Sequence, residues 1–193
     1  MLRAQAVKLF TDTSPAWIRL AVERFDEVLV DHAHCEKKAA ASALSMLSAF
    51  PQAPGLPRAM ARLAREESGH LGQVLSLIEK RRLSLGRDPG DPYAQALLAL
   101  VRQPVRERLL DRLLVSALIE ARSEERLRLL GEHLPEPELR EFYDRLARSE
   151  AGHAELFLKL AQRSGFDVDA RLEELSRAEA KLVRELPVRA AIH

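Results

Sequence analysis

Two short motifs of the same form place ionisable side chains where an apolar helix face is expected. They are Glu67-Ser-Gly-His70 and Glu150-Ala-Gly-His153. A spacing of three puts the Glu and the His of each motif on one face of a helix. Apolar residues flank both motifs at spacings of three and four, which is the pattern of a core-facing stripe. A carboxylate and an imidazole in such a stripe cost free energy unless a partner compensates them, and a metal ion would do so.

A glutamate lies upstream of each motif at a matched distance. Glu36 precedes the first motif by 31 residues and Glu120 precedes the second by 30, each in mid-helix among apolar or small residues. The chain therefore repeats one arrangement, a helix with Glu followed by a helix with Glu-x-x-His. Four such helices supply four carboxylates and two imidazoles at one level of a bundle, which is the ligand set of di-iron and di-manganese carboxylate proteins.

This ligand set suits two divalent metal ions. Four carboxylates balance the charge of two such ions, carboxylates can bridge metals, and one imidazole for each metal suits iron. The predicted metal ligands, which are also the catalytic residues through the metals, are Glu36, Glu67, His70, Glu120, Glu150 and His153. In this assignment Glu36 and His70 hold one iron, Glu120 and His153 hold the other, and Glu67 and Glu150 bridge them. The predicted cofactor is two iron ions (Fe2+/Fe3+), with manganese as the less favoured alternative.

Prolines and glycines divide the sequence into helical segments, and residues that favour strands are scarce. The predicted helices cover about 15–50 (bent near 23–26), 57–85, a short stretch ending near 102, 104–133, 137–165 and 168–186. The predicted fold is therefore all-α: a ferritin-like four-helix bundle with an additional C-terminal helix. We expect a single domain over 1–193, with the bundle core at about 15–165 and a helical tail at about 168–186.

Composition restricts the class of protein further. The formal net charge is +1, which does not by itself indicate a nucleic-acid binder. The single cysteine, Cys35, excludes an internal disulfide and fits a reducing compartment. We find no secretion signal in Met1–Phe10 and no apolar run that is long enough to span a membrane. We therefore expect a cytoplasmic protein that does not bind membranes.

Four segments resemble one known family, the tRNA 2-methylthio-N6-isopentenyladenosine hydroxylases (MiaE-like). They are Asp31-His-Ala-His-Cys-Glu36-Lys-Lys-Ala-Ala40, Glu66-Glu-Ser-Gly-His70, Leu113-Leu-Val-Ser-Ala-Leu-Ile-Glu120-Ala-Arg-Ser123 and Ser149-Glu-Ala-Gly-His153. The resemblance extends over roughly 14–165, and the six predicted ligands fall on the family's motif positions. One departure is Glu124-Glu-Arg-Leu127, where the family has Cys-Glu-Arg-Phe. Glu124 is four residues past Glu120, so it could face the cavity.

The resemblance implies a non-haem di-iron monooxygenase. Its substrate would be tRNA, and O2 would supply the oxygen atom that enters the isopentenyl group of the modified adenosine. An electron-donor protein, such as a ferredoxin with its reductase, would be the further partner.

Two other classes share the ligand set and stay open. One is a ferritin-like protein that handles iron or detoxifies peroxide, and the other is a di-iron hydroxylase of another apolar substrate. The stripe Arg58, Arg62 and Arg65 has two interpretations, a contact for tRNA phosphates or an ordinary solvated helix face. We favour the solvated face because the net charge is close to zero.

Overall fold

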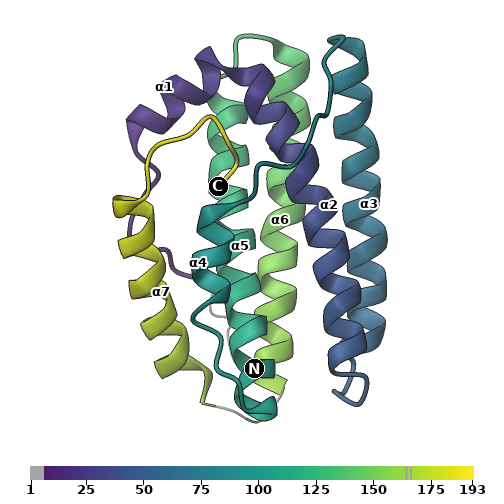
Figure 1. The fold of residues 1–193 in the computed structure, drawn as a ribbon, viewed down its shortest axis with the longest axis vertical. Coiled ribbons are helices and arrows are strands. Elements are labelled where there is room, and N and C mark those ends of the chain that lie inside the picture. The colour runs from purple at the N-terminus through teal and green to yellow at the C-terminus, as the bar shows by residue number, and fades with distance from the viewer. Residues whose placement is uncertain (1–6, 164, 166) are drawn as a thin grey trace. The chain divides into compact units, whose positions relative to one another are not determined.

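The computed structural model describes residues 7–163, 165 and 167–193, and within these ranges all regular structure is helical (Figure 1). The helices are α1 (Pro15–Glu23), α2 (Phe25–Ala49), α3 (Leu56–Lys80), α4 (Pro92–Leu98), α5 (Val105–His133), α6 (Pro137–Arg163) and α7 (Val168–Glu185). None of the helices in the described ranges has a window apolar enough to cross a membrane. Residues 1–6, within the stretch searched for a secretion signal, lie outside the described residues.

The described chain forms two compact units, which are treated separately below. The first comprises residues 16–90 and 189–192, and its main feature is the hairpin of α2 and α3. Its C-terminal segment is held by two hydrogen bonds: the Trp17 indole Nε1 donates to the Ala191 carbonyl at 2.9 Å, and the Ile192 N–H donates to the Asp31 carboxylate at 2.7 Å. These two bonds attach residues 191 and 192 to α1 and α2, which lie far away in the sequence.

The helix boundaries of this unit confirm one prediction and correct another. The predicted bend near 23–26 is a break at Arg24 between α1 and α2. The prediction that the next helix extends to 85 is wrong, because α3 ends at Lys80. Arg82 adopts a left-handed φ of 57°, and the Leu83 N–H donates to the Ile78 carbonyl at 3.0 Å. This geometry ends the helix. Glycine is the usual residue in such a left-handed conformation after a helix, and here the residue is an arginine.

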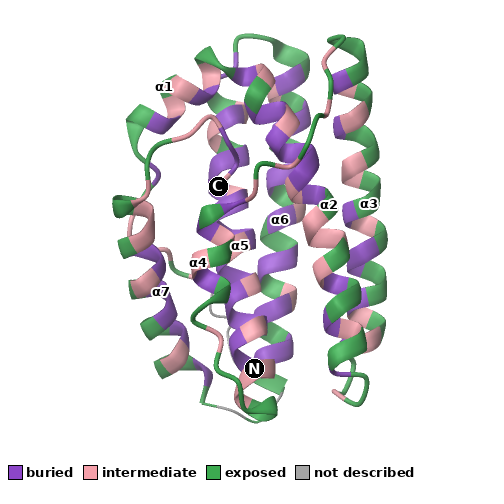
Figure 2. Cartoon of the chain, viewed as in Figure 1, coloured by how far each residue is buried: buried purple, intermediate pink, exposed green. Residues whose placement is uncertain are grey.

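The second unit comprises residues 7–15, 91–163, 165, 167–188 and 193 of the described chain. Here α5 and α6 form a hairpin, while α4 and α7 contact α5 (Figure 1). The short helix predicted to reach 102 ends at Leu98, since the next residues form tighter turns in which Leu100 and Val101 donate to Leu97 and Leu98. The predicted C-terminal helix is confirmed as α7. Buried residues occur on several faces of α5, as Figure 2 shows.

A buried cluster of charged groups joins α5 to α7 and to the segment before α1. The Arg122 side chain is fully buried and donates to both oxygens of Glu179, to Glu125, and to the Thr11 carbonyl at 2.8 Å. The Thr13 N–H and hydroxyl both donate to Glu125, at 2.9 and 2.6 Å. Because a buried charge is tolerated only when it is paired and hydrogen-bonded, this arrangement defines how these three segments pack. We call it the Arg122 cluster.

A second buried carboxylate, Asp111 of α5, joins the loop after α4 to α7. It accepts hydrogen bonds from the Arg102 backbone and guanidinium and from the Arg171 guanidinium, at 2.7–3.0 Å. Burial opposes ionisation of this carboxyl, but the hydrogen bonds from the two arginines outweigh it and hold the pKa at about 2, below the usual 3.8.

This depressed pKa predicts a pH-dependent contribution to stability. We expect Asp111→Asn to lower the free energy of unfolding by about 2 kcal/mol at pH 7. The carboxylate contributes above its unfolded pKa near 4, and the contribution is lost as the pH falls toward 2. Urea unfolding of both proteins at several pH values measures this difference. Asp144→Asn, which removes an exposed partner of Arg148, is the control and is expected to change stability by less than about 1 kcal/mol. A deficit of Asp111→Asn that does not shrink between pH 4 and pH 2 would contradict the analysis.

Candidate metal centre

Three of the predicted ligands meet between α2 and α3. Glu36 comes from α2, while Glu67 and His70 lie one turn apart on α3. The Nδ1 atom of His70 lies 3.3 Å from Glu67 Oε2 and 3.6 Å from Glu36 Oε2. One donor atom of each residue lies within 4.8 Å of the other two. We call these three residues the first half-site.

A neighbouring histidine fixes one of these carboxylates. His32 precedes Glu36 by one helical turn, and its Nε2 lies 2.7 Å from Glu36 Oε1, with both side chains buried. Since a carboxylate can only accept, the His32 ring donates this hydrogen bond. Glu36 Oε2 is the oxygen that faces His70. His32 therefore orients the carboxylate so that one oxygen is held by the protein and the other is directed at the imidazole.

The remaining three predicted ligands meet between α5 and α6. Glu120 comes from α5, and Glu150 and His153 come from α6. The His153 Nδ1 atom lies 3.2 Å from Glu150 Oε2, and one donor atom of each of the three residues lies within 4.8 Å of the other two. This second half-site reproduces the first in composition, helix spacing and the ring atom that the histidine presents.

The chemistry of each half-site fits a divalent metal ion. Two carboxylates and one imidazole converge in each, and five of the six residues are buried, with Glu67 only 1% exposed. Two carboxylates this close repel each other in a poorly solvated environment, so a cation between them lowers the free energy of the group. Carboxylate oxygen with neutral imidazole nitrogen is a donor set that iron, manganese and zinc accept. In both half-sites Nδ1 is the nitrogen placed to bind.

The residues around the ligands differ between the two half-sites, and one difference affects how a carboxylate is held. His32 and Glu36 correspond, at the offset of 84 residues, to Ser116 and Glu120. The half-buried Ser116 cannot present an imidazole to its glutamate as His32 does. The two half-sites thus offer the same ligands but different support for them. The four-residue spacing of His32 and Glu36 places them on one helix face, whereas the direction of the His32 ring is visible only in the structure.

Other residues noted in the sequence lie apart from the ligand groups of their own units. The Glu124 side chain is about a third exposed and pairs with Arg128 of the same helix at 3.5 Å. His34 approaches the Leu85 carbonyl at 3.2 Å, and the Cys35 thiol donates to Asp31 at 3.6 Å. On α3, Arg62 pairs with Glu66 at 3.5 Å, which fits a solvated helix face. The Arg122 cluster was not anticipated, because its hydrogen bonds join residues that are up to 112 positions apart in the sequence.

Comparison with known proteins gives these groups a context. A family model described as tRNA-(MS[2]IO[6]A)-hydroxylase (MiaE) matches residues 1–193. A curated protein of Pseudomonas putida, named tRNA 2-(methylsulfanyl)-N(6)-isopentenyladenosine(37) hydroxylase, is 44% identical over 174 residues, covering 89% of this chain and 84% of that protein. A protein of the same name from Salmonella typhimurium is 38% identical over 125 residues, covering 64% of this chain and 46% of that protein.

Among solved structures, a protein from Synechococcus described as having aldehyde deformylating oxygenase activity is similar over nearly its whole length. The TM-score is 0.91 at 41% identity, with 96% of this chain and 94% of the other covered. The predicted all-α, ferritin-like four-helix fold with an additional C-terminal helix is thereby confirmed.

Proposed function

The chain belongs to the MiaE family of tRNA hydroxylases, and we propose that it hydroxylates the isopentenyl group of 2-methylthio-N6-isopentenyladenosine in tRNA, using two iron ions. Membership in the family makes it an enzyme that acts on tRNA. The observation that carries the rest of the proposal is the pair of half-sites, each with two carboxylates and one imidazole at the positions of the repeated motif. Carboxylate and imidazole groups suit a metal that reacts with O2, and the two half-sites are placed to hold such metals.

In the proposed centre the two half-sites would act together. Glu36 and His70 would hold one iron, Glu120 and His153 would hold the other, and Glu67 and Glu150 would be shared between them. Four carboxylates neutralise two ferrous ions, which removes the cost of burying either charge alone. When bound, the irons supply the electrons and the coordination positions that O2 activation requires. The protein side chains hold the metals, exclude water and orient the substrate's prenyl group.

His32, beside the first half-site, and His70, within it, have further roles in this proposal. His32 donates to Glu36 and so limits the orientations that this carboxylate can adopt. His70 has a side chain that is 12% exposed, whereas that of Glu67 is 1% exposed. His70 is therefore more open to solvent than Glu67. The buried ligands keep bulk water from the metals.

The remaining partners follow from the reaction. Hydroxylation by O2 places one oxygen atom in the product and reduces the other to water, so two electrons from outside are required. We propose a small electron-donor protein, such as a ferredoxin with its reductase, as their source. The substrate is a cellular tRNA, so the expected compartment is the cytoplasm.

A second candidate function rests on the Synechococcus structure, whose described activity is oxygenation of an aldehyde. At 41% identity over almost the full chain, the same fold and ligand set could accept another apolar substrate. The family match favours tRNA over this alternative. An iron-handling or peroxide-detoxifying role is a third possibility, because it requires the same ligands.

Nucleoside mass analysis tests the proposed function. The iron-loaded protein is incubated with tRNA that carries 2-methylthio-N6-isopentenyladenosine, together with a reductant and O2, and the tRNA is digested. We expect a nucleoside heavier by one oxygen atom with the wild-type protein and none with Glu67→Ala. Parallel incubations with a long-chain aldehyde and with peroxide test the alternatives. If iron is bound but only the aldehyde or the peroxide is consumed, the proposal that tRNA is the substrate is wrong. The proposal of a metal centre would still stand.

The ligand assignment predicts the metal content of variants. Glu67→Ala and His153→Ala, which remove one ligand from each half-site, should each reduce bound iron well below the wild-type ratio. The matched controls are Glu66→Ala, beside the first ligand, and Glu155→Ala, an exposed residue of the second motif's helix. Iron quantification after desalting measures the ratio. Wild-type iron content in both ligand variants would overturn the assignment.

The hydrogen bond from His32 to Glu36 predicts that loss of His32 affects the binding of one metal ion more than that of the other. His32→Ala should weaken the binding of one metal ion about 10- to 100-fold and leave the second ion less affected. Titration of the metal-free protein with Co2+, followed by absorption spectroscopy, resolves the two binding events. Ser116→Ala, at the corresponding position of the other half-site, should leave both events unchanged. His32→Gln, which keeps a hydrogen-bond donor, should restore part of the affinity. Equal weakening of both ions by His32→Ala would contradict a role in orienting Glu36.

A further inference from the structure

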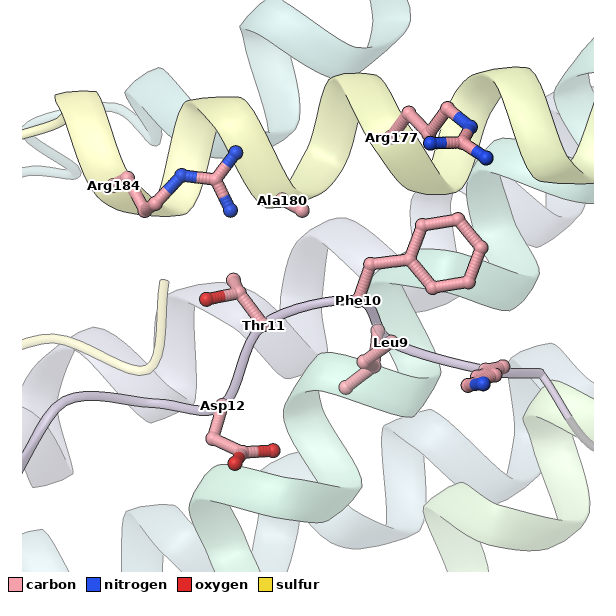
Figure 3. A pocket seen from close by; sticks show the side chains of 8 residues that line it. Leu9, Phe10, Thr11, Asp12, Arg177, Ala180 and Arg184 are labelled. Carbon is pink, nitrogen blue, oxygen red and sulfur yellow. The ribbon is translucent and has the colours of Figure 1, made fainter.

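A pocket in the second unit lies between α7 and the chain segment that precedes α1 (Figure 3). Its volume is about 700 Å3, which is within the range of small-molecule binding sites. Its lining residues are Lys8, Leu9, Phe10, Thr11, Asp12, Arg177, Ala180 and Arg184. None of them belongs to either half-site.

Both walls of the pocket are anchored by the Arg122 cluster. Arg122 Nη2 donates to the Thr11 carbonyl in one wall at 2.8 Å, while its Nε donates to Glu179 of α7 at 2.9 Å. Ala180, between the two arginines of α7, is small and only 2% exposed. The two segments that line the pocket are thus joined through one buried side chain.

The pocket concentrates positive charge in a chain that is nearly neutral. Three cations (Lys8, Arg177 and Arg184) line it with one carboxylate, Asp12, giving a local charge of +2, while the whole chain has a net charge of +1. Arg177 also pairs with Glu173 at 2.5 Å. Arg184 has no hydrogen bond or ion pair with any residue that the structure describes, so its guanidinium is available to an anion. The two arginines are seven residues apart on α7, or roughly 10 Å along the helix axis.

An aromatic ring lies beside these cations. Phe10 is 38% exposed, and its ring has Lys8 Nζ at 5.8 Å and the Arg177 guanidinium at 5.5 Å from its centroid. A single exposed phenylalanine is ordinary on a protein surface, and what distinguishes Phe10 is the pair of cations beside its ring. A ring flanked by cations is the surface on which single-stranded RNA stacks a base, while the cations contact the adjacent phosphates.

We propose that this pocket is an RNA contact site, in which Arg177 and Arg184 bind backbone phosphates of the tRNA substrate and Phe10 stacks against a neighbouring unpaired base. The site is separate from the residues that hold the metals and rests on the proposed function for the identity of its ligand. A lipid headgroup would use the cations but has no flat group for Phe10. RNA uses both features.

Binding of the full chain to tRNA, followed by fluorescence anisotropy at several salt concentrations, tests this site. The double variant Arg177→Ala/Arg184→Ala should weaken binding about tenfold at about 0.1 M salt and flatten the plot of log affinity against log salt by roughly 1 to 2. Phe10→Ala should weaken binding about tenfold, and Phe10→Tyr, which keeps a stacking ring, should restore it. Arg145→Ala/Arg148→Ala, two exposed arginines of α6 that also pair with acids, is the matched control and should bind as the wild type does.

The outcomes distinguish a failure of the RNA contact site from a failure of the proposed hydroxylase function. Unchanged affinity in the α7 double variant and in Phe10→Ala, while the wild type binds and hydroxylates tRNA, overturns this site and leaves the function standing. Lost affinity in these variants, while the wild type binds tRNA without hydroxylating it, supports the site and rejects the function. If the double variant loses affinity for vesicles of phosphatidylglycerol and retains it for tRNA, the ligand is a lipid surface and the RNA proposal is wrong. Thermal unfolding confirms that each variant is folded before binding is compared.

Discussion

A carboxylate inside a helical protein is stable only when a cation or several hydrogen-bond donors compensate its charge. Helix α5 shows two ways to meet this requirement. On one face, Arg122 of α5 pairs with Glu179 of α7 inside the protein. Glu120 is two residues earlier, which is about 200° around the helix, and belongs to a half-site with a second carboxylate and one imidazole. On the Arg122 face, the protein itself supplies the cation that pairs with the carboxylate. On the Glu120 face, the two carboxylates would be compensated by a cation that is not part of the chain.

The sequence predicts those features that depend on local spacing. A Glu and a His three residues apart must share a helix face, so the grouping of Glu150 with His153 follows from geometry alone. Helix ends are less predictable. Because Arg82 adopts a positive φ that is rare outside glycine, the end of α3 cannot be read from residue types. The Arg122 cluster depends on contacts between distant segments, and its glutamates and threonines are indistinguishable in the sequence from ordinary surface residues.

The repeat in the sequence explains why the two groups of predicted ligands could be identified and the asymmetry between them could not. Two copies of one motif at matched offsets single out the same predicted ligand types in each copy. Residues around the ligands have diverged, so that one half-site has a histidine where the other has a serine. The hydrogen bond of His32 depends on the rotation of its ring toward Glu36, which the identity of the residue does not specify. The two half-sites therefore have the same predicted ligands, but different neighbouring residues hold those ligands in place.

Net charge is a poor guide to what such a chain binds, and α7 illustrates the reason. A polyanion responds to charges within about one Debye length, or roughly 10 Å at 0.1 M salt, so the local arrangement matters more than the sum over the chain. Several exposed arginines here, such as Arg145 and Arg148, pair with an acid one helical turn away that offsets their field. Arg184 has no such partner among the described residues and shares a pocket with two more cations. A nearly neutral protein can therefore present an anion site, provided that its acids are paired elsewhere.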